Sequence, residues 1–311
     1  AEPQIQVTPS TAISIRRGAG AVSAHSRGLY DYFTFANLHQ PCAAYATAAA
    51  GSPGQAFVTA AVATNRCQAL RDLGLVTGDT TTAQANDALA KLLAAGWESE
   101  SIPYQASHYA FATVSIAVTY ANTYGRFGVR DNLCGFSFAA SPAGTPAVLP
   151  TASAVQLFAA GNGIPPTGGL NIINNNSVGG AFTDAASVSP STNRQDFNID
   201  GALCLRSLAT GTNPVTGAAL TGTALANANA VSAGIAQVRR AANLRGKPAI
   251  IVHGRSDTLI PVNHTSRPYY ALNKNGEGAA SKLAYYEVTN AQHFDTFIGN
   301  AAGSEPAEVQ R

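Results

Sequence analysis

The amino-acid sequence predicts an α/β protein, in which the closing part of a parallel β-sheet follows a large, mostly helical insertion. A helical pattern over 224–240 precedes a β-branched segment at 249–252, and a second strand pattern follows at 283–288. Earlier, residues from about 15 to 214 combine scattered helical signals with long stretches rich in Gly, Pro, Asn and Thr. The alternating segment EPQIQV, near the start of the chain, is typical of one further strand.

One helix of the insertion is clearly marked. The threonines at 80–82 can cap a helix that Gly96 ends. Its apolar residues recur at helical spacing, and they are Ala88, Leu89, Leu92 and Leu93. The segment 161–180 is instead dense in turn-forming residues, which indicates an irregular loop or a short hairpin.

The change of pattern along the chain predicts three parts. Residues 1–10 would form the end of a core strand. Residues 11–240 would form an inserted lid, or cap. Residues 241–311 would form the closing core segment, which would carry the functional side chains.

The closing segment has the order expected of a βαβ unit. The helix at 224–240 is predicted from apolar residues at three- and four-residue steps, with Gly246 as a stop. These apolar residues are Leu225, Ala228, Val231, Ile235 and Val238. The segment AIIV at 249–252 lies between turn formers, and its continuous apolar character predicts a fully buried parallel strand. LAYYEV at 283–288 is the partner strand.

The composition excludes several classes of protein. With 311 residues and 46% apolar content, the chain can bury one large core or two modest ones. Only 12% of its residues are charged, the formal net charge is +2, and no basic run could follow a phosphate backbone. No apolar stretch approaches the length of a membrane span, and the first residues lack the layout of a signal peptide. We therefore expect neither nucleic acid nor a membrane as a partner.

The four cysteines are Cys42, Cys67, Cys134 and Cys204. None forms a CxxC pair, which argues against a zinc cluster or a redox centre. Two disulfides in an exported protein and four buried thiols in a cytoplasmic one both remain open. Pairing of neighbours, Cys42 with Cys67 and Cys134 with Cys204, is one of three possible connectivities.

Two polar residues stand where parallel strands place catalytic groups, beyond the strands' carboxyl ends. Asp257 comes five residues after the first predicted strand and His293 five residues after the second. Their separation of 36 positions fits a loop, one helix and one strand. Such a carboxylate can orient an imidazole that acts as general base. An acid followed by a histidine, late in the chain, is the order of the α/β-hydrolases, so Asp257 and His293 are the predicted catalytic acid and base.

Asp257 and the histidines can each also be interpreted as structural residues. Asp257 alone would suit a turn, and His293 alone would suit a partly exposed surface position. His253, beside the strand end, could line the site, but the structural interpretation is favoured, and His264 is expected near the start of the next helix. The remaining histidines, His25, His39 and His108, are too dispersed for metal ligation. No metal or other cofactor is therefore expected.

The nucleophile that this pair requires is hard to find. The nearest approach to G-x-S-x-G is Gly135 to Ala139, with Ser137 at its centre. It lacks the second glycine, and Pro142 and Pro146 leave no room for the helix that should follow. Ser137 is therefore not favoured.

Long strings of the chain resemble the D-(−)-3-hydroxybutyrate oligomer hydrolases. The segments 246–273 and 283–302 resemble the C-terminal part of that family, and the resemblance continues upstream through 106–140, 161–175 and 187–206. It covers nearly the whole chain. The resemblance implies an α/β-hydrolase fold and hydrolysis of the ester bonds in short oligomers of 3-hydroxybutyrate, a small-molecule oligoester, through a serine nucleophile. It also places the family's acid and histidine on Asp257 and His293.

The chain departs from the family at its ends. Family members are considerably longer, and their nucleophile lies in an SNGG-type elbow shortly before the segment that matches EPQIQV. We therefore expect the chain to be a C-terminal fragment, or one chain of a cleaved enzyme, with the N-terminal half of the same enzyme as its partner. Residues from about 10 to 240 would be the lid that shapes the site for a hydrophobic oligoester. The compartment expected is secreted or periplasmic, in a bacterium.

Two other interpretations of function remain open. A tannase or feruloyl-type esterase would act on aromatic esters, and a non-catalytic binding fragment would have no chemistry at all. One further motif, Asp196-Phe197-Asn198-Ile199-Asp200-Gly201, matches the first half of a calcium loop, but position twelve is Ser207 instead of Glu. An Asx-rich turn is the favoured interpretation of that motif.

Overall fold

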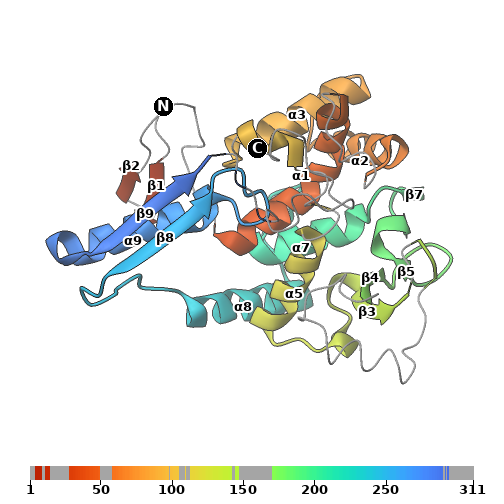
Figure 1. The fold of residues 1–311 in the computed structure, drawn as a ribbon. Coiled ribbons are helices and arrows are strands. Elements are labelled where there is room, and N and C mark those ends of the chain that lie inside the picture. The colour runs from red at the N-terminus through yellow and green to blue at the C-terminus, as the bar shows by residue number, and fades with distance from the viewer. Residues whose placement is uncertain are drawn as a thin grey trace.

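The computed structural model describes most of the chain. The described residues are 4–8, 11–14, 28–49, 58–97, 99–104, 109, 113–141, 144–146, 170–289, 291 and 293. A body of helices occupies one side of the molecule, and a βαβ unit extends from it on the other (Figure 1). This mixture of helix and sheet is compatible with the predicted α/β class. No helix of the described residues is both long enough and apolar enough to cross a membrane.

The helical body is built around α1, Leu29–Ala49, which α2, α3, α5 and α7 all contact (Figure 1). The surrounding helices are α2 (Ala60–Asp72), α3 (Thr81–Ala94), α5 (Val114–Gly125), α7 (Ile199–Thr210) and α8 (Gly222–Val238). Short 3-10 turns connect them, at Ser99–Tyr104, Val129–Asp131, Leu133–Gly135 and Asp184–Ala186.

The predicted helix after the threonine cluster is confirmed. The Thr80 hydroxyl accepts a hydrogen bond from Ala83 N at 3.2 Å, which satisfies one of the free N–H groups at the start of α3. The helix ends at Ala94, shortly before Gly96, whose φ of +114° an L side chain rarely adopts.

The predicted helix at 224–240 is α8, displaced by two residues. It buries Ala228, Val231 and Gly234 against the helical body. Leu225 and Val238, which share the predicted apolar pattern, are exposed. Gly234 lies against the backbone of Tyr124 in α5, where an added Cβ would meet the carbonyl oxygen at 1.9 Å. The close approach of α5 and α8 therefore requires glycine at this position.

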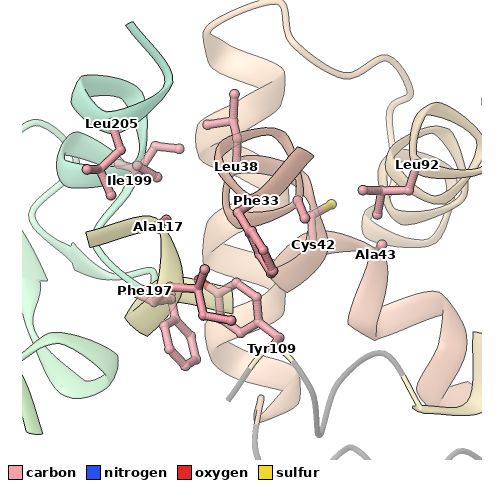
Figure 2. Close-up of a cluster of buried hydrophobic side chains, with 14 of the residues drawn as sticks. Phe33, Leu38, Cys42, Ala43, Leu92, Tyr109, Ala117, Phe197, Ile199 and Leu205 are labelled. Atoms are coloured by element: carbon pink, nitrogen blue, oxygen red, sulfur yellow. The ribbon is translucent and has the colours of Figure 1, made fainter. Parts of the chain in front are cut away.

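The core lies between α1 and the helices around it (Figure 2). Each large apolar side chain buried there contributes roughly 1.5–3 kcal/mol relative to exposure. Figure 2 labels Phe33, Leu38, Cys42, Ala43, Leu92, Tyr109, Ala117, Phe197, Ile199 and Leu205.

Arg66 of α2 lies fully buried beside this core. Its guanidinium donates to four backbone carbonyls, those of Asn37 and Leu38 in α1 and of Asp196 and Phe197 before α7, at 2.6–3.0 Å. One side chain thus joins three segments that are distant in the sequence.

All four cysteines form disulfides. Cys42 pairs with Cys67 and joins α1 to α2, and Cys134 pairs with Cys204 and joins the turn before β3 to α7. This is the pairing of neighbours, so the structure selects one of the three connectivities that the sequence left open.

Small antiparallel sheets border the helical body. Strand β3 (Phe136–Ala140) pairs with β4 (Leu170–Asn174), which pairs with β5 (Phe182–Thr183). A hairpin of β6 (Val188–Ser189) and β7 (Arg194–Gln195) follows. In the segment 161–180, residues 170–174 form strand β4, while 161–169 lie outside the described residues.

Near the start of the chain, β1 (Gln4–Thr8) pairs antiparallel with β2 (Thr11–Ser14). Strand β1 also contacts α9 of the βαβ unit. A strand in this segment was expected, but its place at the end of a core sheet stays a prediction. The division into core and lid at residues 10 and 240 stays a prediction as well.

The closing βαβ unit is confirmed. Strand β8 (Ala249–Gly254) runs parallel to β9 (Leu283–Val288), and α9 (Ser266–Glu277) connects them, flanked by 3-10 turns at Val262–His264 and Gly278–Ala280. The expectation that β8 is fully buried is wrong, because Ile250 and Val252 are exposed. Within the described residues this sheet has two strands, and α9 contacts one of its faces.

Candidate functional site

The candidate site lies beyond the carboxyl ends of β8 and β9. The segments that leave the two strands are hydrogen-bonded to each other: Arg255 N donates to Val288 O at 2.8 Å, and Ser256 N donates to Ala291 O at 3.0 Å. Gly254 permits this approach, since an added Cβ would meet Ala291 O at 2.5 Å. The two loops therefore stay side by side after the strands end.

The structure brings Asp257 and His293 together. Oδ2 of Asp257 lies 3.0 Å from Nδ1 of His293, across 36 residues of sequence. The other oxygen, Oδ1, accepts hydrogen bonds from the backbone N–H groups of Leu259 and Ile260, at 2.9 and 2.8 Å. The Asp257 side chain is buried, while 30% of the His293 side chain is exposed. This arrangement fixes the carboxylate and leaves the imidazole accessible.

Asp257 is held in its charged form. Burial alone would raise the pKa of Asp257, but hydrogen bonds from His253, His293 and the Ile260 backbone hold that pKa well below its usual range. A buried carboxylate that is ionised at neutral pH can orient an imidazole and stabilise its cation. The geometry thus suits the pair for the roles of acid and base, although their catalytic role stays a prediction.

His253 is closer to the acid than the sequence indicated. Its Nε2 lies 3.4 Å from Oδ2 of Asp257, and its Nδ1 lies 2.5 Å from Oγ of Ser266 at the start of α9. Of the two interpretations of His253, this contact with Asp257 supports the one that lines the site, which the sequence did not favour. One signal was available, because the alternation of a strand places residue 253 on the same face as 249 and 251, the face that α9 covers.

A buried polar network continues from this histidine across the sheet. Oγ of Ser266 lies 3.0 Å from the Tyr285 hydroxyl, which donates to Glu287 at 2.7 Å. Glu287 also accepts two hydrogen bonds from Arg267 and one from Arg255. Burial alone would raise the pKa of Glu287, but these donors, Arg267 first, lower it to about 2. The network anchors the site to α9.

The helical body contacts the loop that carries the acid. The Tyr32 hydroxyl in α1 donates to the carbonyl of Thr258 at 2.9 Å, and the Tyr32 ring stacks on His264 at 4.6 Å. Asn263 donates to the carbonyl of Gly96 at 2.8 Å. His264 lies just before α9, as expected. Contacts between residues far apart in the sequence thus hold the segment 257–264 in place.

The other candidate residues lie elsewhere or have different partners. The Ser137 hydroxyl, on β3, donates to Asn175 Oδ1 at 3.0 Å, in a sheet separate from β8 and β9. His39 is buried in α1 near the carbonyl of Phe35, and burial lowers its pKa to about 4. His25 and His108 lie outside the described residues.

The calcium-like motif forms a turn and a helix start. Asp196 accepts hydrogen bonds from the hydroxyls of Ser189 and Thr192 and from the backbone N–H of Ile199. Asn198 caps α7 by accepting from Gly201 N. Within the described residues, no cluster of three or more His, Cys, Asp or Glu side chains could hold a metal ion. The interpretation as an Asx-rich turn accounts for these contacts.

Comparisons with known proteins agree with the resemblance in the sequence. A family described as 3HB-oligomer hydrolase matches residues 1–308. The chain is 56% identical over 304 residues to a D-(-)-3-hydroxybutyrate oligomer hydrolase of Polaromonas naphthalenivorans, 54% identical over 301 residues to one of Azoarcus sp., and 48% identical over 306 residues to one of Cupriavidus necator. These matches cover 96–97% of this chain and 41% of each relative. No solved structure matches.

Proposed function

The chain belongs to the 3HB-oligomer hydrolase family, and on that premise we propose that it supplies the acid and the histidine of a serine esterase active site. The substrate proposed is a short oligomer of 3-hydroxybutyrate, whose ester bonds the enzyme hydrolyses. The observation that carries the proposal is the 3.0 Å contact between Asp257 Oδ2 and His293 Nδ1, beyond the ends of two parallel strands.

The proposed mechanism follows from the geometry of the pair. Asp257 accepts a hydrogen bond from the N–H at Nδ1 of His293, so that Nε2 is the basic nitrogen. Nε2 takes the proton of a serine hydroxyl as that oxygen attacks the ester carbonyl, and His293 then protonates the departing alcohol. Water, activated by the same nitrogen, hydrolyses the acyl-enzyme and restores the serine.

The serine is proposed to lie outside these 311 residues. The chain spans about 41% of the length of the curated relatives it matches, and it contains no complete G-x-S-x-G. Ser137, the nearest approach to that motif, donates its hydroxyl to Asn175. A nucleophile in the remaining part of the longer polypeptide agrees with these observations.

The helical body is proposed to act as the lid of this site. The contacts of Tyr32 with Thr258 and of Asn263 with Gly96 support this role, because they tie the helices to the acid loop. A helical layer of low charge beside the site suits a hydrophobic oligoester. The two disulfides support an oxidising compartment, and we therefore propose a secreted or periplasmic location.

The test uses the full-length polypeptide and hydrolysis of the 3-hydroxybutyrate dimer. Asp257→Asn keeps the shape of the side chain but loses its charge, and we expect kcat to fall by about 10⁴-fold. His293→Ala should be at least as damaging, whereas Asp79→Asn, at an exposed position, should leave kcat unchanged. An Asp257→Asn enzyme with wild-type kcat would defeat the assignment.

A fluorophosphonate locates the nucleophile. We expect the labelled serine in the part of the polypeptide that precedes these residues. A label on Ser137, or on any other serine of the 311, would contradict the proposal of an external nucleophile. Faster hydrolysis of aromatic esters than of the dimer would favour the tannase or feruloyl-type alternative.

A further inference from the structure

Among the residues that the structure describes, one face of the two-stranded sheet is largely uncovered. In the parallel register, Val252 pairs with Tyr286 and Gly254 pairs with Val288, so Ile250, Val252, Tyr286 and Val288 project from the same face. Their exposed fractions are 71%, 65%, 58% and 45%. We call these four residues the open face.

The opposite face is covered by α9. His253 and Tyr285 contact Ser266, and Glu287 is bound by Arg267, both at the start of that helix. Tyr285 also packs against Tyr270, with ring centroids 5.5 Å apart. The two faces of the same strands therefore differ completely, although both carry large side chains.

A parallel sheet is not expected to leave such a face in water. Parallel strands occur almost only where both faces are covered, and their residues are then apolar on both sides, as in AIIV. The open face consists of three β-branched aliphatic side chains, Ile250, Val252 and Val288, and of Tyr286, whose hydroxyl is its one polar group. We expect such a surface to pack against an apolar surface that carries no formal charge.

The length of the relatives suggests which polypeptide covers the open face. The chain spans about 41% of its curated relatives, so most of the polypeptide of those relatives lies outside these residues. We propose that the open face is the surface on which that remaining part of the polypeptide packs, through an apolar face of its own. This inference rests on the proposed function, because the same part is proposed there to carry the serine.

The position of the open face fits this partner. Val252 precedes Asp257 by five residues, and Val288 precedes His293 by five. A unit that packs along these strands therefore lies beside the two loops that carry the acid and the histidine. From there it can bring a serine to the exposed imidazole with short connections, since residues beyond strand ends gather at one edge of a parallel sheet.

The experiment measures protection of the open face in the full-length polypeptide. Val252→Cys is compared with Val178→Cys, the same substitution at a residue that is 49% exposed in the loop after β4. Each variant is labelled with a maleimide, and the rate at each cysteine is read by peptide mass spectrometry. We expect Val252→Cys to react at least about tenfold more slowly, because labelling requires opening of the packed face.

Equal labelling rates would overturn the inference, and so would protection that disappears on dilution, which would identify a second copy as the occupant. If Val252→Cys does not fold, Val252→Ala and Val178→Ala are compared by thermal unfolding. We expect the former alone to lower Tm, by about 2 °C or more, because only it removes a buried side chain. Equal values of Tm would refute the inference. Neither readout uses substrate, so failure here leaves the assignments of Asp257 and His293 to the kinetic test.

Discussion

The imidazole Nε2 of His253 lies 3.4 Å from Oδ2 of Asp257, the same oxygen that His293 contacts at 3.0 Å. One carboxylate oxygen thus lies between two imidazoles. His253 stands on β8 and is anchored to α9 through Ser266, whereas His293 stands on the loop after β9. The first histidine therefore contacts Asp257 from the side of α9, and the second is the more exposed of the two.

This arrangement predicts that His253 positions the acid. In the full-length polypeptide, His253→Ala should lower kcat by about tenfold or more with little change in KM, because Asp257 loses one of its donors. His253→Gln keeps an N–H donor on its side chain and should retain more activity. Steady-state hydrolysis of the dimer measures both. An effect confined to KM, or equal losses in the two variants, would contradict the role.

The Glu287 network predicts an acid-dependent loss of stability. Its pKa is lowered from 4.5 to about 2, so its charge stabilises the fold fully above about pH 4.5. That stabilisation is lost as the pH falls from 4.5 through 2. The difference in pKa corresponds to about 3 kcal/mol at neutral pH.

Glu287→Gln tests this prediction by urea unfolding between pH 2 and pH 7. The variant should be less stable at pH 7, where it leaves Arg267 buried without its carboxylate, and the difference should shrink toward pH 2. Asp79→Asn, at a fully solvated position, is the matched control and should follow the wild type. A difference independent of pH would exclude the electrostatic explanation.

The two disulfides should contribute unequally to the free energy of unfolding. Their cysteines are separated by 25 residues in one bond and by 70 in the other. Loop-closure entropy predicts that the free energy of unfolding falls by about 3.5 kcal/mol in the double variant Cys42→Ser/Cys67→Ser. In the double variant Cys134→Ser/Cys204→Ser it should fall by about 4.4 kcal/mol. Denaturant unfolding of the two double variants ranks them. A larger loss from the shorter loop would mean that effects other than chain entropy dominate.

The close contact of α5 and α8 predicts that one added methyl group lowers the stability of the protein. Gly234→Ala places a Cβ against the carbonyl of Tyr124, so the helices must separate, at a cost of about 1–3 kcal/mol. Gly276→Ala, in α9, meets nothing within 4 Å and should be neutral or stabilising by about 0.5–1 kcal/mol. Thermal unfolding compares the two. Similar values of Tm would show that α8 can move at no cost.

Local patterns predicted the framework of the site. The βαβ unit followed from short β-branched segments at the right separation, and the helix at Thr81–Ala94 followed from its threonine cap and its apolar period. The meeting of Asp257 and His293 was predictable too, because parallel neighbouring strands place the residues after them at one edge. Each of these inferences needs only residues near in sequence and the known geometry of strands and helices.

Other features depended on which segments meet in space. Strand alternation placed His253 on the face that α9 covers, but no local pattern predicted that His253 would share an oxygen of Asp257 with His293. Nor did a local pattern predict that Arg66 would bind four carbonyls from two other segments. The error on the burial of β8 has the same origin, because apolar content shows what a strand favours and not what covers it.

The sequence by itself thus determined the mixture of helix and sheet, the strands of the site, the meeting of Asp257 with His293 and the family, because spacing and long matching segments carry this information. Only the tertiary structure decided the connectivity of the cysteines, the second imidazole at Asp257 and the open face of β8 and β9. These depend on distances between residues remote in the chain, which packing sets and which no local pattern encodes.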